Sequence, residues 1–320
     1  MSTDPAQAPF RFDGRVAVVT GAGRGIGRGY ARLLAARGAQ VVVNDLGGSA
    51  EGEGSDAGPA QQVVDAIVAA GGEAVADTHD VSTPEGGAAI VQTALDTFGR
   101  IDVLVNNAGI VRWAGLPEAD LANLEAHLDV HVAGSFNTMK AAWPHFVAQS
   151  YGRVVLTTST GLLGLPNNLG YAVAKAGTIG LARSARLAGR EHNITVNCIA
   201  PAALTRLAGG PAADLAEAPP ADAPSGTGMP VMPSNAVAPL VAYLCHEDCP
   251  VSGEVYTAGA GRFARLFIGS TPGWVSPTDG PASVEDVAAN FAAIGDEDGY
   301  SVPGDLMAWS AQFLSHQLPG

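Results

Sequence analysis

The stretch VAVVTGAGRGIG, from Val16 to Gly27, contains a short apolar run followed at once by closely spaced glycines. The run has the length and composition of a buried strand, and Gly21, Gly25 and Gly27 predict a tight turn that opens a helix near Gly25. Such a turn lets the backbone approach a pyrophosphate and directs the helix N-terminus at it. The stretch therefore predicts the start of a nucleotide-binding α/β fold, with a plain tight turn as the alternative for the glycines alone.

The same alternation of strand and helix continues along the chain. Short apolar runs recur at helix-sized intervals, and they read VAVVT, VVVND, EAVAD, DVLVNN, RVVLTTS and ITVNCIA. This alternation predicts repeated βαβ units, and hence an α/β fold with a doubly wound parallel sheet, the Rossmann fold. We expect a single domain over residues 1–261, with a C-terminal helical extension over residues 262–320 that packs on the same domain.

Two segments interrupt this alternation. Residues 46–60 are rich in Gly, Ser and acidic residues, and we expect a surface loop there. Residues 202–233 are rich in Ala, Pro and Gly and follow the sixth apolar run. Because ligands of open α/β sheets bind beyond the carboxyl ends of the strands, the second segment is predicted to be a flexible lid, with a disordered surface excursion as the alternative.

The charge balance limits the classes of partner. The 320 residues carry 31 acidic and 17 basic side chains, a net charge of −14, and 47% of them are hydrophobic. This composition predicts a globular chain and argues against a surface for nucleic acid or anionic membrane, which needs clustered Lys and Arg. We expect a small-molecule substrate and a homodimer or homotetramer, with no nucleic acid and no membrane as partners.

The three cysteines do not form a disulfide pattern. Their small, odd number, an N-terminus unlike a signal peptide and the lack of a membrane-length apolar run together predict a reducing, cytoplasmic location. Cys245 and Cys249 stand in a CxxxC spacing, which is a weak metal signal without a second pair. A helix end followed by a turn is the preferred interpretation, and no metal site is predicted.

Asp45 ends the second apolar run, eighteen residues after Gly27. A carboxylate at this place accepts hydrogen bonds from both hydroxyls of an adenosine ribose and repels the 2′-phosphate of NADP, which predicts NAD as the cofactor. Arg24 is the opposing signal, because a guanidinium in the glycine turn could reach that phosphate or turn to solvent. Asp80, after the third run, is a candidate contact for the adenine edge, with a surface turn as the alternative.

Tyr171 and Lys175 lie four residues apart in GYAVAK, and on a helix they share one face. Oxidation of a secondary alcohol requires a base beside the carbinol oxygen, and a phenol with an ordinary pKa of about 10 is a poor base at neutral pH. An adjacent ammonium and a positive nicotinamide both favour the phenolate, and lowering its pKa by about three corresponds to roughly 4 kcal/mol. Tyr171 is predicted to be the base, with Lys175 supporting it and holding the nicotinamide ribose.

Three motifs in order resemble those of the short-chain dehydrogenase/reductase family. They are TGxxxGIG at Thr20 to Gly27, NNAG at Asn106 to Gly109 and YxxxK at Tyr171 to Lys175. The segments VVVNDLGG, FGRIDVLVNNAGI, VHVAGSF and AGAGRFARL, with the extended tail, resemble the (3R)-hydroxyacyl-CoA dehydrogenase branch of that family, found in type 2 peroxisomal multifunctional enzymes and bacterial relatives. The resemblance covers nearly the whole chain and is weakest over residues 208–233.

The resemblance implies a cofactor site at the carboxyl ends of the strands. Its expected members are Gly21, Arg24, Gly25, Ile26, Gly27, Asp45, Asp80, Val81, Asn107, Ala108, Gly109, Tyr171, Lys175, Pro201 and Thr205. Asn106 and Gly109 are expected to shape the floor of this pocket, and Thr205 to meet the nicotinamide amide. The resemblance further implies that subunits associate through the helix at residues 137–149 and the helix that follows Tyr171.

A substrate-orienting hydroxyl is expected in RVVLTTSTG. Ser159 stands twelve residues before Tyr171, one fewer than the family usually has, so counting forward along the strand gives Ser159 and counting back from Tyr171 gives Thr158. Neighbouring strand residues point to opposite sides, so both cannot serve equally. Ser159 is predicted, with Thr158 as the alternative.

His131, in VHVAG, stands where most of the family has Asn. The Asn is thought to hold a proton-relay water through its backbone carbonyl, and a His supplies the same carbonyl. His131 is therefore predicted to be a catalytic residue, with a packed core histidine as the alternative.

The predicted function is transfer of a hydride between NAD(H) and a secondary alcohol or ketone, foremost a 3-hydroxyacyl-CoA. The low content of basic residues speaks against an anionic CoA ester, for which Arg28, Arg112 and Arg206 are the nearest partners. A dehydrogenase of a neutral hydroxysteroid or another bulky secondary alcohol is the alternative. A catalytically inactive NAD-binding sensor or scaffold is a remote alternative, which the intact Tyr171 and Lys175 oppose.

Overall fold

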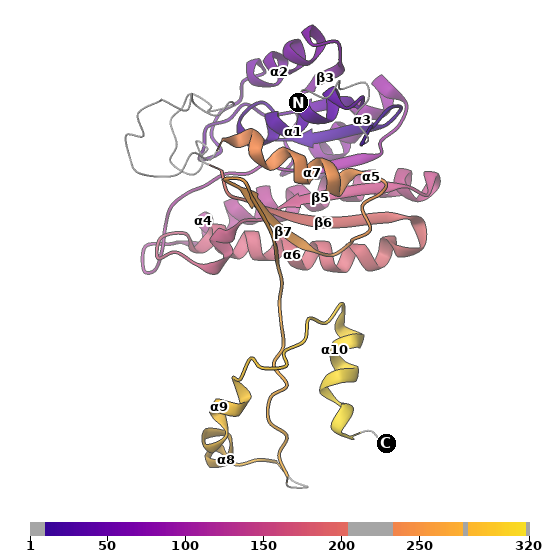
Figure 1. Cartoon of the computed structure of the whole chain (residues 1–320). Helices are drawn as coiled ribbons and strands as arrows, with labels where there is room; N and C mark the ends of the chain where they lie inside the picture. The colour runs from indigo at the N-terminus through magenta and orange to yellow at the C-terminus, as the bar shows by residue number, and fades with distance from the viewer. Residues whose placement is uncertain (1–9, 204–232, 278–280, 318–320) are drawn as a thin grey trace. The chain divides into compact units, whose positions relative to one another are not determined.

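The computed structural model describes residues 10–203, 233–277 and 281–317 (Figure 1). The chain divides into two compact units, Met1–Arg265 and Leu266–Gly320. Most of the residues predicted to form a lid, together with Thr205 and Arg206, lie outside the described residues. Among the helices that are described, none is long and apolar enough to cross a membrane.

In the described part of the first unit, a sheet of eight strands has the order β3-β2-β1-β4-β5-β6-β7-β8. The pairs from β3 through to β7 are parallel, and Val18 of β1 lies opposite Val42 of β2 and Leu104 of β4. The predicted doubly wound parallel sheet is therefore confirmed. The six predicted runs form β1 Val16–Thr20, β2 Gln40–Asn44, β3 Glu73–Asp77, β4 Val103–Asn106, β5 Gly152–Thr157 and β6 Ile194–Pro201.

The last two strands of the sheet were not predicted from apolar runs. β7 Val255–Gly259 pairs in parallel with β6, and β8 Arg262–Leu266 follows after Ala260 and Gly261. A two-residue connection requires neighbouring strands to be antiparallel. The φ angles of 49° at Ala260 and 76° at Gly261 suit the tight turns that match the twist of such hairpins.

Helices cover both faces of the sheet (Figure 1). On one face α1 Gly25–Ala36 packs between α2 Gly58–Ala69 and α7 Ala238–Cys245. On the other face α5 Gly134–Gln149 packs between α3 Pro84–Phe98 and α6 Leu169–Gly189. The short helix α4 Leu121–His127 continues into the π-helical turn η2 Leu128–Ala133, which leads into α5. The described part of the first unit also contains the 3-10 turns η3 Thr160–Leu163, η4 Arg190–His192 and η6 Ser234–Val237.

The central strands lie in the apolar core. Every residue of β1, β4 and β5 is buried, as expected for parallel strands covered on both faces. Leu34 of α1 and Val241 of α7 pack in the same cluster as Val19 of β1 and Val105 of β4. This packing fixes the carboxyl ends of the strands, where the predicted site residues lie.

The chain order reverses between β1 and β4. The segment after β1 leads to β2 on one side, while β4 lies on the other side of β1. Ligands of open α/β sheets bind at such a switch point, beyond the carboxyl ends of the strands. Thr20 ends β1 and Asn106 ends β4, so the glycine turn and the NNAG motif meet there.

The loop after β2 agrees with the prediction except at its end. Residues 51–57 are exposed, but α2 begins at Gly58, so the expectation of loop through Ala60 is wrong at its last three positions.

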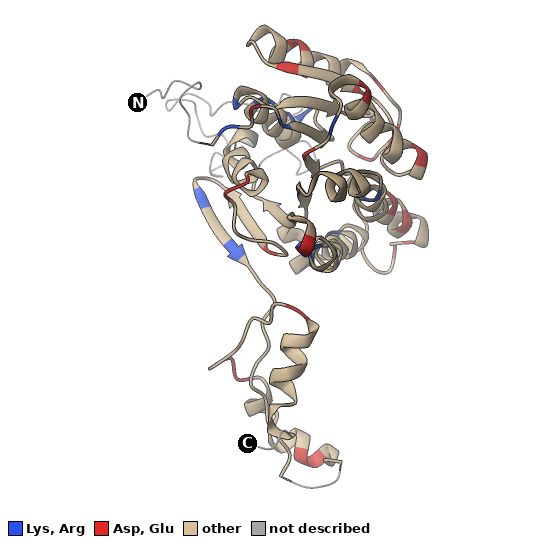
Figure 2. Ribbon diagram, turned by 90° about the vertical axis from the view of Figure 1, so that its right-hand side faces the viewer, with Lys and Arg blue, Asp and Glu red and all other residues tan. Residues whose placement is uncertain are grey.

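Acidic and basic positions are interspersed over the elements of the first unit in the view of Figure 2, a pattern typical of an ordinary solvated surface.

The second unit contains the two predicted C-terminal helices. The first forms as α8 Val284–Ala289 and α9 Phe291–Ile294, and Ser283 caps α8 in a reciprocal hydrogen-bonded box with Asp286. The second forms as α10 Leu306–Phe313 with the 3-10 turn η7 Ser315–Gln317. The packing of residues 262–320 on the first domain stays a prediction.

Candidate active site

The glycine turn packs directly against the end of β4. Gly21 has a φ of 60°, and a Cβ built on it would come within 2.8 Å of the Ala108 Cα. A Cβ on Gly27 would overlap the carbonyl oxygen of Gly21. Asn107 closes the contact, because its side-chain amide donates to the carbonyl oxygens of Thr20 at 3.0 Å and Gly21 at 2.9 Å. Only glycine permits this close approach at both positions.

Helix α1 begins at Gly25 without a side-chain cap, and Ile26 follows in its first turn. The first turn of a helix favours an anion, because its N–H groups and its dipole both point at the ligand. Arg24 directs its guanidinium away to the loop after β2, where it donates to the Gly48 carbonyl oxygen at 3.1 Å. The predicted residues of the turn thus come together in an arrangement suited to a pyrophosphate.

Asp45 is tied to the glycine turn by its carboxylate. One oxygen accepts the Gly23 N–H at 2.8 Å and the other accepts the Gly47 N–H at 2.7 Å. An ionised carboxylate has about four acceptor positions, so both oxygens keep capacity for ribose hydroxyls. Gly23 was not predicted as a site residue, although it is the middle glycine of GAGRG, and a Cβ there would lie 2.9 Å from the Asp45 carboxylate.

The turn after β3 contains Asp80 and Val81. The Asp80 carboxylate accepts the Ser82 N–H at 2.9 Å, which agrees with the turn interpretation. Val81 is buried, and its carbonyl oxygen accepts the Asn137 side-chain amide at 3.0 Å. A contact of Asp80 with an adenine edge stays a prediction.

Asn106 and Asn107 have different surroundings. Asn106 is buried between β4 and α5, where it accepts the Thr138 hydroxyl at 2.7 Å and donates to the Ser135 carbonyl oxygen at 3.2 Å. The side-chain oxygen of Asn107 is buried without a hydrogen-bond partner among the described residues. A buried acceptor of this kind requires a donor, and this one lies between the glycine turn and the NNAG motif.

Ser159, rather than Thr158, lies beside Tyr171. A Cβ built on Gly161 would be 3.1 Å from the Tyr171 ring and 3.2 Å from the Ser159 Oγ, so both groups border the same small residue. Ser159 Oγ also accepts the Gly161 N–H at 3.0 Å. Thr158 is buried, and its hydroxyl donates to the Lys175 carbonyl oxygen at 2.6 Å.

Lys175 reaches the end of β5 from α6. Its Nζ donates to the Thr157 carbonyl oxygen at 2.7 Å and lies 5.6 Å from the centroid of the Tyr171 ring. Burial lowers the pKa of Lys175 to about 7. Burial also raises the pKa of Tyr171, and the hydrogen bond with Ser159 opposes that effect. The expectation that Lys175 lowers the Tyr171 pKa is therefore not met by the protein groups alone.

His131 lies buried in η2 beneath the NNAG motif. Its Nε2 lies 2.9 Å from the Ile110 carbonyl oxygen and 3.4 Å from the Ile110 backbone nitrogen, while its Nδ1 has no hydrogen-bond partner among the described residues. A Cβ on Gly109 would lie 2.6 Å from the imidazole Cε1, so the last glycine of NNAG leaves room for this ring. The His131 carbonyl oxygen accepts the Ser135 hydroxyl at 2.7 Å. Burial holds the pKa of the imidazole well below its usual value.

His127 was missed as a member of this cluster. Its ring stacks on that of His131, with centroids 6.0 Å apart, and meets the Tyr171 ring edge to face at 6.1 Å. The His131 ring meets Tyr171 edge to face at 5.5 Å. The available signal was the spacing of the two histidines in HLDVH, which places them on one helix face.

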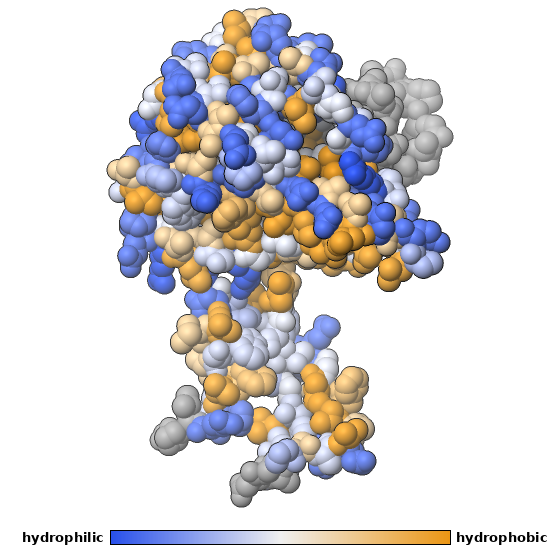
Figure 3. All heavy atoms as spheres, turned by 180° about the vertical axis from the view of Figure 1, so that it is seen from behind, coloured by the Kyte–Doolittle hydropathy of each residue, from blue (hydrophilic) through white to orange (hydrophobic). Residues whose placement is uncertain are grey.

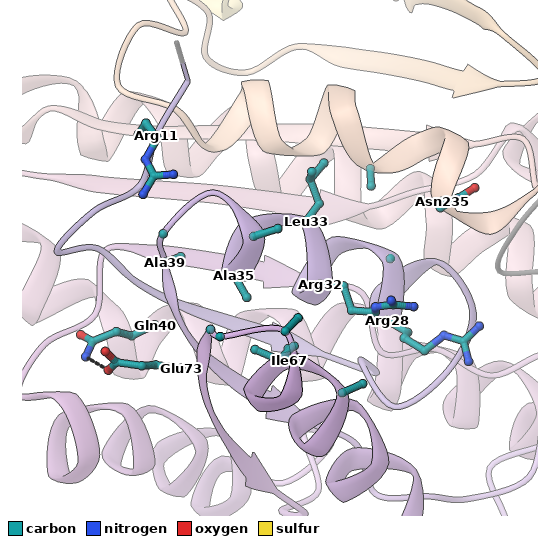
Figure 4. Close-up of a pocket in the computed structure, with 18 of the residues that line it drawn as sticks. Arg11, Arg28, Arg32, Leu33, Ala35, Ala39, Gln40, Ile67, Glu73 and Asn235 are labelled. Atoms are coloured by element: carbon teal, nitrogen blue, oxygen red, sulfur yellow. Dashed lines mark hydrogen bonds between the residues drawn. The ribbon is translucent and has the colours of Figure 1, made fainter. Parts of the chain in front are cut away.

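Pro201, Cys245 and Arg28 were also singled out from the sequence. Pro201 ends β6. Cys245 ends α7, in agreement with the preferred interpretation of the CxxxC spacing. Arg28 lines a groove of about 700 Å³ along α1, together with Arg32 and Leu33 (Figure 4). That groove lies on the α1 face of the sheet, whereas Tyr171 belongs to α6 on the other face.

Comparisons with known proteins agree with this geometry. A family model described as short chain dehydrogenase matches residues 15–208. A Mycobacterium tuberculosis protein named as a short-chain type dehydrogenase/reductase is 43% identical over 291 residues, covering 91% of this chain and 97% of that protein. The Drosophila melanogaster peroxisomal multifunctional enzyme type 2 is 42% identical over 281 residues, which are 87% of this chain and 44% of the enzyme.

Two solved structures are also similar. The full-length Drosophila enzyme superposes with a TM-score of 0.75 at 33% identity, covering 96% of this chain and 50% of that one. A 7α-hydroxysteroid dehydrogenase complexed with NADH and 7-oxo glycochenodeoxycholic acid superposes with a TM-score of 0.66 at 28% identity, covering 78% of this chain and 95% of that one. This chain thus spans about half of the multifunctional enzyme. With the family model matched over residues 15–208 of 320, the chain belongs to the short-chain dehydrogenase family.

Proposed function

We propose that the chain is an NAD(H)-dependent oxidoreductase that interconverts the secondary alcohol and the ketone of a 3-hydroxyacyl-CoA. The observation that carries this proposal is the meeting of Ser159, Tyr171 and Lys175 at the carboxyl end of β5. Because the strands are parallel, the glycine turn and Asp45 lie at the same edge of the sheet. A base and a dinucleotide cradle at one edge are the two parts that hydride transfer requires.

The three side chains have distinct roles in this proposal. Ser159 donates its hydroxyl to the substrate oxygen and orients it, and Tyr171 accepts the hydroxyl proton as the alcohol is oxidised. Lys175 holds the nicotinamide ribose and, once protonated, stabilises the phenolate. NAD⁺, when bound, accepts the hydride. The His131 carbonyl oxygen, which accepts the Ser135 hydroxyl, is the atom that would hold a relay water.

The residues of the cradle fit NAD. Asp45 directs a carboxylate at the place of an adenosine ribose, while Arg24 is held on the Gly48 carbonyl oxygen instead of beside that carboxylate. The buried side-chain oxygen of Asn107 supplies an acceptor for a cofactor hydroxyl or amide. Repulsion between the Asp45 carboxylate and a 2′-phosphate favours NAD over NADP.

The substrate class rests on similarity. The relatives named peroxisomal multifunctional enzyme type 2 match most of this chain, and the branch that the sequence resembles acts on (3R)-hydroxyacyl-CoA esters. A second candidate is a neutral hydroxysteroid, which the similarity to the 7α-hydroxysteroid dehydrogenase and the low content of basic residues both favour.

The oxidation of NADH and NADPH, measured separately with acetoacetyl-CoA and with a steroid ketone, tests the proposal. We expect NADH to be consumed with the thioester and NADPH to be consumed far more slowly. Turnover of the steroid ketone without turnover of the thioester would favour the second candidate, a neutral hydroxysteroid, as the substrate. Absence of turnover with either substrate, in protein that still binds NADH, would favour a sensor or scaffold and overturn the proposal.

A homodimer or homotetramer is also part of the proposal. Phe136 of α5 and Val173 and Leu187 of α6 expose 45 to 47% of their surface. Figure 3, from behind, shows apolar surface along the lower part of the first unit. Sedimentation of the purified protein measures its mass, and a monomer at micromolar concentration would contradict this part. The cytoplasmic location stays a prediction.

A further inference from the structure

His127 connects the Tyr171 ring to the loop that carries the cofactor-binding carboxylate. We propose that His127 is a positioning residue, which fixes the orientation of the Tyr171 phenol and is itself held by Arg112, a residue that also contacts the loop of residues 46–56. This inference rests on the proposed function, because it takes Tyr171 to be the base. His127 itself touches neither substrate nor cofactor in this account.

Both nitrogens of the His127 imidazole have fixed partners. Nε2 accepts the backbone N–H of Arg112 at 3.1 Å, so the proton is on Nδ1, which donates to the Asn123 carbonyl oxygen at 2.7 Å. Burial lowers the pKa of the ring, the hydrogen bond to the Asn123 carbonyl oxygen opposes this effect, and the charges of Arg112 and Lys175 add to the lowering. A buried ring with both nitrogens bonded has a single orientation.

The His127 ring contacts the Tyr171 ring directly and also through His131. It meets the phenol edge to face at an interplanar angle of 80°, and it stacks on His131, which meets the phenol at 88°. Edge-to-face contacts between aromatic rings are favourable beyond the burial of their area, because the positive edge of one ring meets the negative face of the other. A rotation of the His127 ring would disturb both contacts.

The start of α6 packs against the same helix turn. A Cβ built on Gly170, the residue before Tyr171, would lie 2.9 Å from the His127 Nδ1 and 2.6 Å from the Asn123 side-chain oxygen. The backbone that carries the phenol is thus in contact with His127. A larger or differently oriented side chain at position 127 would displace this backbone.

The partner of His127 leads to the cofactor-binding loop. Arg112 Nε donates to the Glu51 carbonyl oxygen at 2.7 Å, and the Val111 N–H donates to the Ala50 carbonyl oxygen at 2.9 Å. That loop follows Asp45, whose carboxylate accepts the Gly47 N–H. A continuous series of hydrogen bonds and ring contacts therefore runs from the adenosine end of the cradle to the Tyr171 ring.

The test compares His127→Phe with a matched control, His246→Phe. His246 is also a buried histidine with both nitrogens within hydrogen-bond distance of backbone groups and with two edge-to-face rings, Phe10 and Phe12, but it lies at the end of α7 outside the site. We expect His127→Phe to lower kcat by at least about tenfold with the Kd for NADH changed by less than about twofold. His246→Phe is expected to lower the Tm by a similar amount and to leave kcat within about twofold.

His127→Gln keeps an acceptor for the Arg112 N–H but loses the ring. It is the test variant to use if His127→Phe does not fold. We expect it to lower kcat by at least about fivefold. If His127→Phe and His127→Gln both fold and retain kcat within about twofold of the wild type, while Tyr171→Phe is inactive, this inference is overturned and the proposed function stands. Wild-type-like turnover by Tyr171→Phe, or an inactive wild type, overturns the proposed function and this inference with it.

Discussion

Thr158 donates its hydroxyl to the Lys175 carbonyl oxygen at 2.6 Å, whereas the next residue, Ser159, borders the Tyr171 ring. Adjacent residues at the end of a strand point to opposite sides, so one hydroxyl anchors α6 and the other faces the site. The sequence left both residues as candidates for the substrate-orienting hydroxyl, and the structure places only Ser159 beside Tyr171. The two hydroxyls should consequently have separable effects.

Replacing Ser159 by Ala should lower kcat by about a hundredfold, because it removes the donor to the substrate oxygen. Since the Ser159 hydrogen bond opposes the burial that raises the Tyr171 pKa, its loss should also move the ionisation limb of the oxidation pH profile to higher pH. Thr158→Val should instead cost about 1 kcal/mol of unfolding free energy and leave that limb in place. The kcat–pH profiles of the two variants test whether Ser159 or Thr158 is the substrate-orienting hydroxyl. A shifted limb in Thr158→Val would reverse the assignment to Ser159.

Asp45→Asn should weaken the preference for NADH. The substitution removes the carboxylate charge at the expected place of the ribose and replaces one acceptor for the Gly23 and Gly47 N–H groups by a donor. The ratio of NADPH to NADH dissociation constants should fall by about tenfold or more. Fluorescence titration with both cofactors measures this ratio. Asp96→Asn, at an exposed carboxylate of α3, is the control. An unchanged ratio in Asp45→Asn would remove the argument for NAD.

Gly27→Ala should destabilise the protein and abolish NADH binding. The added Cβ would overlap the Gly21 carbonyl oxygen and the Asn107 amide nitrogen, so the glycine turn must move. Gly180→Ala is the matched control, because Gly180 lies in α6 with open space around a built Cβ. We expect a loss of more than about 2 kcal/mol for the first and a gain of about 0.5–1 kcal/mol for the second in urea unfolding. Equal effects would mean that the turn tolerates a side chain.

The stability contribution of Lys175 should depend on pH. Burial lowers its pKa to about 7, while the unfolded chain keeps an ordinary value near 10.5. Below pH 7 both states carry the proton, and the folded state bears the full cost of a buried charge. Between pH 7 and about 10.5 the unfolded state binds more protons, so the wild type gains stability as the pH rises.

Lys175→Met removes this dependence. The stability of the wild type relative to Lys175→Met, measured without cofactor, should rise by about 2–3 kcal/mol between pH 6 and pH 9. Urea unfolding of both proteins across that range measures the difference. A constant difference would mean that Lys175 keeps an ordinary pKa and remains charged in the folded protein.

The fold follows from features that act locally. The apolar runs from VAVVT to ITVNCIA became β1 to β6, because parallel strands buried on both faces need long stretches of apolar residues. The hairpin of β7 and β8 has no such signal, since β8 is largely exposed and reads RFARL. Its position depends on pairing along β6, which no local pattern encodes.

The site could be predicted where chemistry fixes both residue type and spacing. The glycine turn, Asp45 and the Tyr171–Lys175 pair meet these conditions. Gly23, whose N–H binds Asp45, and His127, whose neighbours come from α6 and the loop after β4, depend on tertiary contacts and were missed. The choice between Ser159 and Thr158 required the direction of each side chain, which a one-residue shift in spacing obscures.

The rate of NADH oxidation with acetoacetyl-CoA, measured side by side for the wild type and Tyr171→Phe, tests the central claim most directly. The substitution removes the phenolic oxygen and keeps the ring in contact with His127 and His131, so NADH binding and folding should be unchanged. We predict turnover by the wild type and a loss of about a thousandfold or more in the variant. A variant that oxidises NADH at the wild-type rate would show that Tyr171 is not the base and would contradict the proposed mechanism.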